Sequence, residues 1–494
     1  MSRFKLRFTI LILALFFFKV YDSLGQNSVG FELQRTFESV DMKNHEDFVL
    51  GNSMFLLTHD HTQYTYSYGL EIQEALLGQF GGLYVFGLTT EFDYDLSILP
   101  IALNVNTFIG GGGGAGAPDG SGLAYRYGCG IKFILNPNIN FLLRYSNYNF
   151  PTGSIGGKQI QWGLSYKVSP STKQYPLDVL MAKQSASIQN TFMLLDANDA
   201  ASIRSRYHAK LVGVEYAAHY NKRFAGLIRL QGAISRKIDG FMAYYTGFSM
   251  KIISIDAVTW NAKTLIGSCG GGGMNTSGGL AYILETGVDF KFPRKAVSIS
   301  RGFNTSHAGS FAANYINIGL KYDFESSFLI GAKGQFRRPL DELRSRFLGL
   351  RTGLNLHKAP NATDKNGLLY TDMTLMYFGL SYPIGSHFEL LGETRWAMGG
   401  DYGAYAEGVF GISSIIFDDK KFKIKIPIHT VIAGGGGIDV GKGVGIQLNL
   451  SLNYMLSENT QLSFSVGRLD MLDGNYDPVS VHLSIHRNLL IYHN

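Results

Sequence analysis

The sequence predicts an all-β protein, a transmembrane antiparallel β-barrel of about 24 strands in three repeats of ~160 residues. Three observations support this fold class. A run of glycines recurs at Gly110, Gly270 and Gly434, at intervals of 160 and 164 residues. Long segments alternate between apolar and polar residues, and helix signals are nearly absent. The composition, with 60 glycines, 12 prolines and 13% aromatic residues, suits many strands joined by tight turns.

The chain begins with a segment typical of a secretory signal peptide. A basic stretch that ends at Arg7 precedes an apolar core at 8–18, and residues 23–25 are small enough for cleavage. The core is too short to cross a membrane as a helix, and no cysteine follows the cleavage site to carry a lipid anchor. We expect residues 1–25 to be removed, so that the mature chain starts at Gln26.

Charge and cysteine content exclude two classes. The formal net charge is +6, and residues 1–25 carry +3 of it, so the mature chain keeps only +3. Such a balance does not indicate a nucleic-acid surface. Two cysteines, Cys129 and Cys269, cannot form a disulfide framework for so long a chain, and we interpret both as small apolar fillers.

The alternating segments indicate strands that cross a bilayer. The clearest is 444–454, and comparable segments at 122–135 and 280–292 occupy the same place in the first two repeats. Strands of soluble sandwiches average about five or six residues, whereas a strand that crosses a membrane needs about 9–11. The apolar faces would meet lipid, and the opposite faces would line a lumen. The candidate lumen residues, which include both signs of charge, are Arg126, Lys132, Arg144, Glu285, Asp289, Lys291, Glu393 and Arg395.

Turn signals divide the third repeat into eight strands. We predict them at 346–356, 367–381, 386–398, 403–417, 422–433, 443–455, 460–468 and 478–490. The glycine runs then mark the end of the fifth strand of each repeat. The predicted organisation is a signal peptide at 1–25, barrel repeats at 26–168, 187–324 and 346–494, and linkers at 169–186 and 325–345.

Three tandem eight-stranded barrels are favoured over one large barrel. A single barrel of 24 or more strands would enclose a wide channel, and no loop in this sequence is long enough to plug it. The interior of an eight-stranded barrel is filled by its own side chains. The alternative remains that the segments between repeats are ordinary turns, plus a hairpin at 328–336, inside one ring.

The first two repeats close with stretches that resemble the terminal strand of bacterial outer-membrane barrels. These stretches are Gly163-Leu164-Ser165-Tyr166 and 319–324, whereas the chain's own end at 489–494 lacks a final aromatic residue. The pattern of paired strands, glycine-rich turn and closing Gly-Leu-x-Tyr strand resembles small porin-like outer-membrane barrels of Bacteroidota, including the family of the conjugative-transfer protein TraO. The resemblance implies a place in the cell outer membrane. Its implied partners are outer-membrane lipid, lipopolysaccharide and the barrel assembly machinery.

One stretch resembles a catalytic motif. Arg144-Tyr145-Ser146-Asn147 is similar to the His-x-Ser-Asn stretch of the outer-membrane lipid A deacylases, with Arg144 at the histidine position. A serine without its base is a weak nucleophile, so we interpret Arg144 as a lumen arginine near a rim.

Two further motifs are interpreted as structural. His59-Asp60-His61 has no evident third metal ligand nearby and is predicted to be a hairpin turn. The glycine runs lead into strands, whereas a phosphate loop leads into a helix. A ligand site repeated three times, at the loops after the glycines, remains an alternative.

The sequence therefore predicts a non-enzymatic outer-membrane β-barrel that acts as a scaffold or as a component of an envelope complex. No catalytic, cofactor-binding or metal-binding residues are assigned, and other envelope proteins are expected partners. Two alternatives stay open. One is a large translocation pore gated by a partner, and the other is a lipid-modifying enzyme that depends on Ser146.

Overall fold

The computed structural model describes most of the chain beyond the predicted signal peptide, which lies outside the described residues. The described residues are 29–40, 42, 47–96, 99–168, 178–198, 204–238, 240–326, 335–339, 344–359, 367, 372–400, 402–419 and 421–493. Strands dominate them, and the one short helical element is the 3-10 turn η1 (Arg236–Ile238). No helix in this part of the chain is long and apolar enough to cross a membrane.

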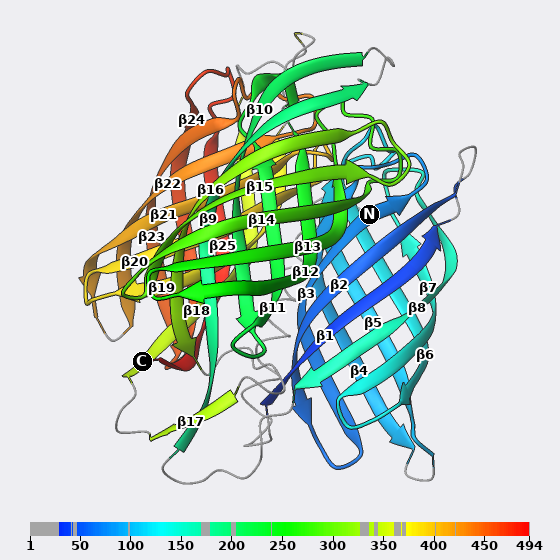
Figure 1. Cartoon of the computed structure of the whole chain (residues 1–494). Helices are drawn as coiled ribbons and strands as arrows, with labels where there is room; N and C mark the ends of the chain where they lie inside the picture. The colour runs from blue at the N-terminus through cyan, green and yellow to red at the C-terminus, as the bar shows by residue number, and fades with distance from the viewer. Residues whose placement is uncertain are drawn as a thin grey trace.

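Barrel 1 consists of eight antiparallel strands in chain order. They are β1(Val29–Val40), β2(Phe48–Asp60), β3(Tyr64–Leu77), β4(Tyr84–Leu96), β5(Ile101–Gly113), β6(Leu123–Ile134), β7(Ile139–Asn149) and β8(Gly156–Val168). The ring closes where β1 pairs with β8, from Phe31 opposite Val168 to Glu38 opposite Gln161. In Figure 1 this barrel runs from blue to cyan.

Barrel 2 repeats the same plan. Its strands are β9(Asp178–Asn198), β10(Arg204–His219), β11(Phe224–Ala233), β12(Met242–Ile255), β13(Val258–Gly270), β14(Leu280–Phe292), β15(Lys295–Ser306) and β16(Ala312–Ser326). It closes where β16 pairs with β9, from Ala313 opposite Leu195 to Ser326 opposite Ala182. Because β9 is longer than its neighbours, its first residues extend beyond this ring.

Barrel 3 contains the last eight strands. They are β18(Arg344–Lys358), β19(Met373–Ile384), β20(Phe388–Gly399), β21(Ala406–Asp418), β22(Phe422–Gly434), β23(Val444–Ser457), β24(Thr460–Met471) and β25(Val479–His493). It closes where β18 pairs with β25, from Arg344 opposite His493 to Lys358 opposite Val479. Within the described residues, one residue pair, Ser326 with His493, connects the strand ladders of barrels 2 and 3.

The prediction of 24 strands in three eight-stranded barrels is confirmed, and the alternative of one large ring is wrong. The glycine runs end the fifth strand of each barrel, β5, β13 and β22, as predicted. The segments predicted as linkers are shorter than expected. Strand β9 already begins at Asp178, inside 169–186, and β18 begins at Arg344. Between them, β17 (Gln335–Pro339) pairs with the start of β9, so part of 325–345 is a strand.

The two ends of every barrel differ in loop length. Short turns join the strands at the end where each barrel's first strand starts and its last strand finishes, and we call this the turn end. Longer connections join them at the opposite end, the loop end. Turns include 61–63, 256–257 and 458–459, and loops include 114–122, 271–279 and 435–443. All three glycine runs therefore lie at the loop end.

The strands alternate between an outward and an inward face, as the sequence predicts. On β23, Leu448 and Leu450 are 55% and 58% exposed, whereas Gln447 and Asn449, which alternate with them, are buried. A continuous apolar outer wall and a polar interior follow from this period of two. Cys129 lies on the exposed outer wall of β6, and Cys269 is buried inside barrel 2.

Candidate functional site

Charged side chains fill the interior of barrel 1 and pair with one another. Arg126 on β6 donates two hydrogen bonds to Glu71 on β3, at 2.7 and 2.9 Å, and lies 3.2 Å from Glu38. The Lys132 ammonium lies 2.6 Å from the Asp93 carboxylate. All five side chains are buried. Both of these buried cations are paired with carboxylates, so this interior is a polar core held by ion pairs.

Barrel 2 has a similar cluster built from other strands. Arg229 on β11 donates hydrogen bonds to Glu285 at 2.8 Å and to Glu215 at 2.9 Å. Lys263 lies 2.7 Å from Glu215, and the Tyr315 hydroxyl donates to Glu285 at 2.7 Å. An arginine between two glutamates thus recurs at the centre of the second barrel.

Barrel 3 contains the same combination of residue types. Arg395 donates to Glu393 and to Glu407, each at 2.9 Å. Arg351 lies 2.6 Å from Glu393, and Tyr405 donates to Glu407 at 2.8 Å. This interior also holds the buried histidines His357, His429, His482 and His486. No group of three or more residues suited to hold a metal ion occurs among the residues that the structure describes.

Apolar side chains close each barrel at its loop end. The buried residues from the loops are Phe80, Leu83, Phe150 and Ile155 in barrel 1, Ile238, Phe241, Met274 and Phe311 in barrel 2, and Ile438, Val440 and Tyr476 in barrel 3. Each loop that follows a glycine run folds the same way. The shared backbone hydrogen bonds run from Ala117 to Gly114, from Met274 to Gly271 and from Ile438 to Gly435. The loops after the glycines therefore pack against the barrel interior.

The three barrels contact one another head to tail. The end of the third strand of each barrel, which carries an alanine, lies against a loop glycine of the next barrel. A Cβ added to that glycine would approach the alanine carbonyl oxygen. The distance from the added Cβ to the carbonyl oxygen is 2.7 Å for Gly279 and Ala75, 3.9 Å for Gly443 and Ala233, and 2.5 Å for Gly122 and Ala397. Barrel 1 thus contacts barrel 2, barrel 2 contacts barrel 3, and barrel 3 contacts barrel 1, so unlike surfaces close into a ring of three.

Hydrogen bonds to backbone carbonyl oxygens strengthen the contact between barrels 1 and 2. The Gly81 amide donates to the Ser277 carbonyl oxygen at 2.6 Å, and the Ser277 hydroxyl donates to Gly78 at 3.0 Å. A Cβ on Gly82, whose φ is +104°, would lie 2.2 Å from the Gly271 amide nitrogen. Glycine at these positions allows two backbones to approach more closely than any other residue would permit.

An apolar cluster lies between the outer walls of the three barrels. Phe86 of barrel 1 contacts Phe378 and Trp396 of barrel 3, with ring centroids 4.9 and 6.0 Å apart. Tyr244 of barrel 2 belongs to the same cluster, and all four side chains are at least 93% buried. These residues have the outward parity of lipid-facing residues, but here another barrel covers them.

The Arg144 and Ser146 side chains both point into barrel 1. The Arg144 guanidinium pairs with Glu91 and donates to Asn104 and Gln161, so Arg144 is a lumen arginine as predicted. The Ser146 hydroxyl lies 3.5 Å from the Glu38 carboxylate and is buried. The arrangement places a serine beside an acid, within an interior that is filled by ion pairs.

The His59-Asp60-His61 triplet lies only partly in a turn. His59 and Asp60 end β2, and His61 opens the turn 61–63, which corrects the prediction that all three form the turn. Asp60 forms an ion pair with Lys167 at 2.6 Å, and His61 stacks on Tyr64 with ring centroids 4.3 Å apart. The strand continues further than the sequence suggests because Asp60 still pairs with Thr65 of β3.

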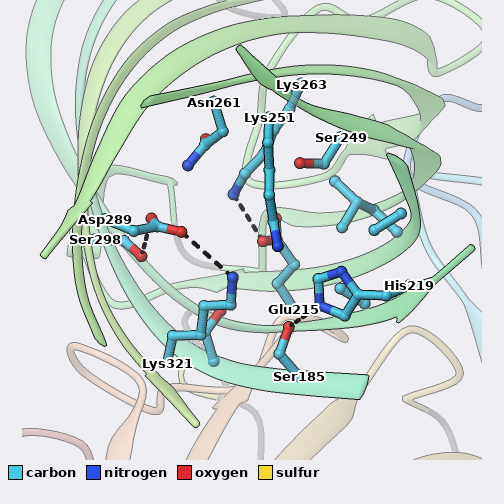
Figure 2. Close-up of a pocket in the computed structure, with 14 residues that line it drawn as sticks. Ser185, Glu215, His219, Ser249, Lys251, Asn261, Lys263, Asp289, Ser298 and Lys321 are labelled. Atoms are coloured by element: carbon cyan, nitrogen blue, oxygen red, sulfur yellow. Dashed lines mark hydrogen bonds and ion pairs between the residues drawn. The ribbon is translucent and has the colours of Figure 1, made fainter. Parts of the chain in front are cut away.

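A cavity opens at the turn end of barrel 2 (Figure 2). It is a small cavity that is open to solvent, and lysines from three different strands line it. They are Lys251 on β12, Lys263 on β13 and Lys321 on β16. The sequence-based lumen residues included Glu285 and Asp289 nearby but none of these lysines. Their inward parity was the available signal, since Lys251, Lys263 and Lys321 lie at an even spacing from the buried, inward-facing residues Tyr245, Asn261 and Asn317 of their strands.

Comparisons with known proteins give only remote likenesses. No protein-family model matches the chain, and no curated protein matches it. The chain is similar to a de novo designed transmembrane β-barrel at 10% identity, with a TM-score of 0.21, over 30% of this chain and 98% of that one.

Larger solved structures match across nearly the whole chain. The siderophore receptor PirA from Acinetobacter baumannii matches at 8% identity with a TM-score of 0.30, over 94% of this chain and 81% of that one. The ferric enterobactin receptor PfeA, in complex with BCV-L6, matches at 10% identity with a TM-score of 0.29, over 94% of this chain and 82% of that one. At such scores, neither likeness carries a conclusion about function.

Proposed function

We propose that this protein is a non-enzymatic β-barrel of the cell outer membrane that acts as a rigid scaffold within an envelope complex. The observation that carries the proposal is that three separate rings close on themselves while paired charges occupy the centre of each interior. An interior blocked in this way leaves the outer walls and the loop end as the surfaces that suit large partners.

The outer wall supports a place in a lipid bilayer. Its strands are long enough to cross a membrane, and their outward faces carry exposed leucine, isoleucine and valine. Exposed aromatic residues gather near the turn end, as in the girdles of membrane barrels. They include Tyr94, Phe292, Tyr322, Phe388, Phe422 and Tyr454. Short turns at one end and longer loops at the other favour a periplasmic turn end and an outward-facing loop end.

The contacts between barrels support a scaffold over three independent units. The head-to-tail ring and the shared apolar cluster join the barrels without relying on the linkers. In lipid, such association depends on close approach through small residues and on hydrogen bonds between segments. A rigid unit of three barrels presents three loop surfaces at fixed spacing, which suits the assembly of several envelope proteins side by side.

Two observations weigh against the alternative functions. A translocation pore needs an open lumen, whereas apolar loops close all three barrels at the loop end. A lipid-modifying enzyme needs its nucleophile at the lipid boundary, whereas Ser146 is 2% exposed and faces the interior. Both observations favour a structural role.

Planar-bilayer recording of the purified mature protein tests this proposal. We expect no stable conductance steps of the size that a trimeric general porin gives in the same membrane. Site-specific photo-crosslinking in living cells tests the scaffold role. A crosslinker at the loop position 116 should capture a discrete envelope protein, whereas one at the lipid-facing position 450 should not. Large steady conductance, or identical capture at both positions, would contradict the proposal.

A further inference from the structure

Three lysines and two carboxylates line the cavity of barrel 2, so its lining carries an excess of positive charge. Asp323 lies beside the cavity, 3.9 Å from Lys321. Glu215 already pairs with Lys263 at 2.7 Å and with Arg229. Asp289 is engaged by Lys321 at 3.3 Å and accepts a hydrogen bond from Ser298 at 2.8 Å. Within the described residues, these are the two carboxylates that line the cavity.

Lys251 is left without an acceptor. Its side chain is partly buried and, among the described residues, makes no hydrogen bond or ion pair. In Figure 2 the side chains of Lys251 and Lys321 extend into the same space from opposite strands. Removing an ammonium group from water costs free energy that a nearby anion can offset. The cavity therefore favours a negatively charged occupant.

The remaining lining groups are suited to the oxygen atoms of such an anion. Ser185, Ser249 and Asn261 also line the cavity, and their hydroxyl and amide groups can donate hydrogen bonds. Lysine binds phosphate as a flexible point charge, without the fixed geometry that arginine imposes. The lysine ammonium groups, together with these neutral hydrogen-bond donors, form a suitable lining for a compact oxyanion.

The surplus charge is a property of this barrel and not of the repeat. Strand β4 pairs Tyr84 with Gly113, and β12 pairs Met242 with Gly270 at the equivalent place. Lys251 lies as far after Met242 as Asp93 lies after Tyr84, so Asp93 occupies the equivalent position in barrel 1. Asp93 forms an ion pair with Lys132 and accepts a hydrogen bond from Asn104. An eight-stranded barrel of this type therefore does not need a lysine there to fold.

We propose that the turn-end cavity of barrel 2 binds a compact oxyanion of the phosphate class, either inorganic phosphate or the phosphate group of a small monoester. Lys251 supplies the unpaired charge, Lys321 adds a second ammonium group, and the hydroxyl groups of Ser185 and Ser249 complete the site. The mouth of the cavity lies at the turn end, so the ligand enters from that side of the membrane. This inference goes beyond the proposed scaffold role.

Titration of the full-length mature protein in detergent micelles with inorganic phosphate tests the inference by calorimetry and by ³¹P NMR. We expect saturable binding to one site in the wild-type protein. Lys251→Met should weaken it by about tenfold or more, which corresponds to the loss of one charge-assisted hydrogen bond. Lys251→Arg should retain most of the affinity, because it keeps the charge.

Lys222→Met is the matched control, since Lys222 is exposed in a turn at the same end and does not line the cavity. It removes the same charge and should leave binding unchanged. Competition by glycerol phosphate distinguishes a monoester site from a site for free phosphate. The absence of saturable binding, or equal loss in Lys251→Met and Lys222→Met, would overturn the proposal. Heat-modified migration on gels verifies that each variant is folded.

Discussion

The hydroxyl of Tyr84 in barrel 1 donates a 2.7 Å hydrogen bond to the carbonyl oxygen of Ser268 in barrel 2. The Ser268 hydroxyl in turn donates to the Ala75 carbonyl oxygen of barrel 1 at 2.8 Å. The two barrels therefore exchange hydrogen bonds across a dry contact, because both side chains are buried. Polar groups in such a place are costly to leave without a partner.

We expect Tyr84→Phe to lower the free energy of unfolding of the three-barrel unit by about 1–2 kcal/mol. The substitution keeps the ring and removes the hydroxyl, which donates to Ser268 and lies 3.4 Å from the Met242 carbonyl oxygen. Guanidinium unfolding in detergent micelles, followed by tryptophan fluorescence, measures the change. Tyr94→Phe is the control, because Tyr94 is 43% exposed on the outer wall. An equal effect of the two substitutions would contradict the role of this contact.

The close backbone approach at the glycine run gives a second prediction. A Cβ on Gly270 would lie 2.3 Å from the Gly81 carbonyl carbon, so alanine must push the two barrels apart. We expect Gly270→Ala to destabilise the unit by about 1–3 kcal/mol through overpacking. Gly392→Ala should have little effect, since nothing lies within 4 Å of its added Cβ. The stability of both variants is compared by the temperature at which the folded band shifts to the unfolded position on semi-native gels. An equal shift temperature for Gly270→Ala and Gly392→Ala would contradict the prediction.

The third prediction concerns the interior of barrel 1. Arg126→Met removes the partner of Glu71 and Glu38 and leaves two buried carboxylates uncompensated. We expect a loss of about 3–5 kcal/mol in the free energy of unfolding, or failure to fold at neutral pH. Arg468→Met, which breaks an exposed pair with Asp470, should change stability by less than about 0.5 kcal/mol. The free energy of unfolding of each variant is measured from its urea-dependent folding into lipid vesicles. Similar losses in the two variants would indicate that the interior ion pairs stabilise the protein no more than surface pairs do.

The fourth prediction concerns pH. Asp119 lies in the loop after the first glycine run, where burial raises its pKa from 3.8 to about 6, although its carboxylate accepts a hydrogen bond from the Gly114 amide. A carboxyl group whose pKa is higher in the folded state favours folding when protonated. Its contribution is complete below about pH 4 and is lost as the pH rises through 6, to a limit of about 3 kcal/mol.

Asp119→Asn should remove this dependence, because the amide stays neutral and its oxygen can still accept from Gly114. We expect the variant to be more stable than the wild type at pH 8 and nearly equal to it at pH 4. Unfolding curves measured across this range give the difference between the two proteins at each pH. A constant difference would show that Asp119 does not titrate in this way.

The strands and their grouping could be predicted because they depend on local pattern. A period of two fixes which face of 444–454 is apolar, and the interval between glycine runs fixes the repeat length. Ring closure follows from an even number of strands whose ends return to one side. The start of β9 could not be predicted, because it pairs with β17 outside the ring.

The partners inside the barrels and the contacts between barrels could not be read from the sequence. Arg126 meets Glu71 across the lumen from a strand three positions away in the ring, so its partner depends on register and barrel tilt. Phe86 and Val105 share the outward parity, yet Phe86 is 7% exposed and Val105 is 50% exposed. An apolar side chain suits lipid and a neighbouring barrel equally well, so its residue type does not tell which one covers it.

The head-to-tail ring of three has a consequence for how this molecule can diversify. In a homotrimer, symmetry copies every substitution into all three subunits, and a charge that serves one lumen must be tolerated by the other two. Here each copy is encoded separately, so Lys251 and Asp93 can occupy the same place in two copies. Duplication within one gene thus preserves the architecture of a trimer while allowing its members to specialise one at a time.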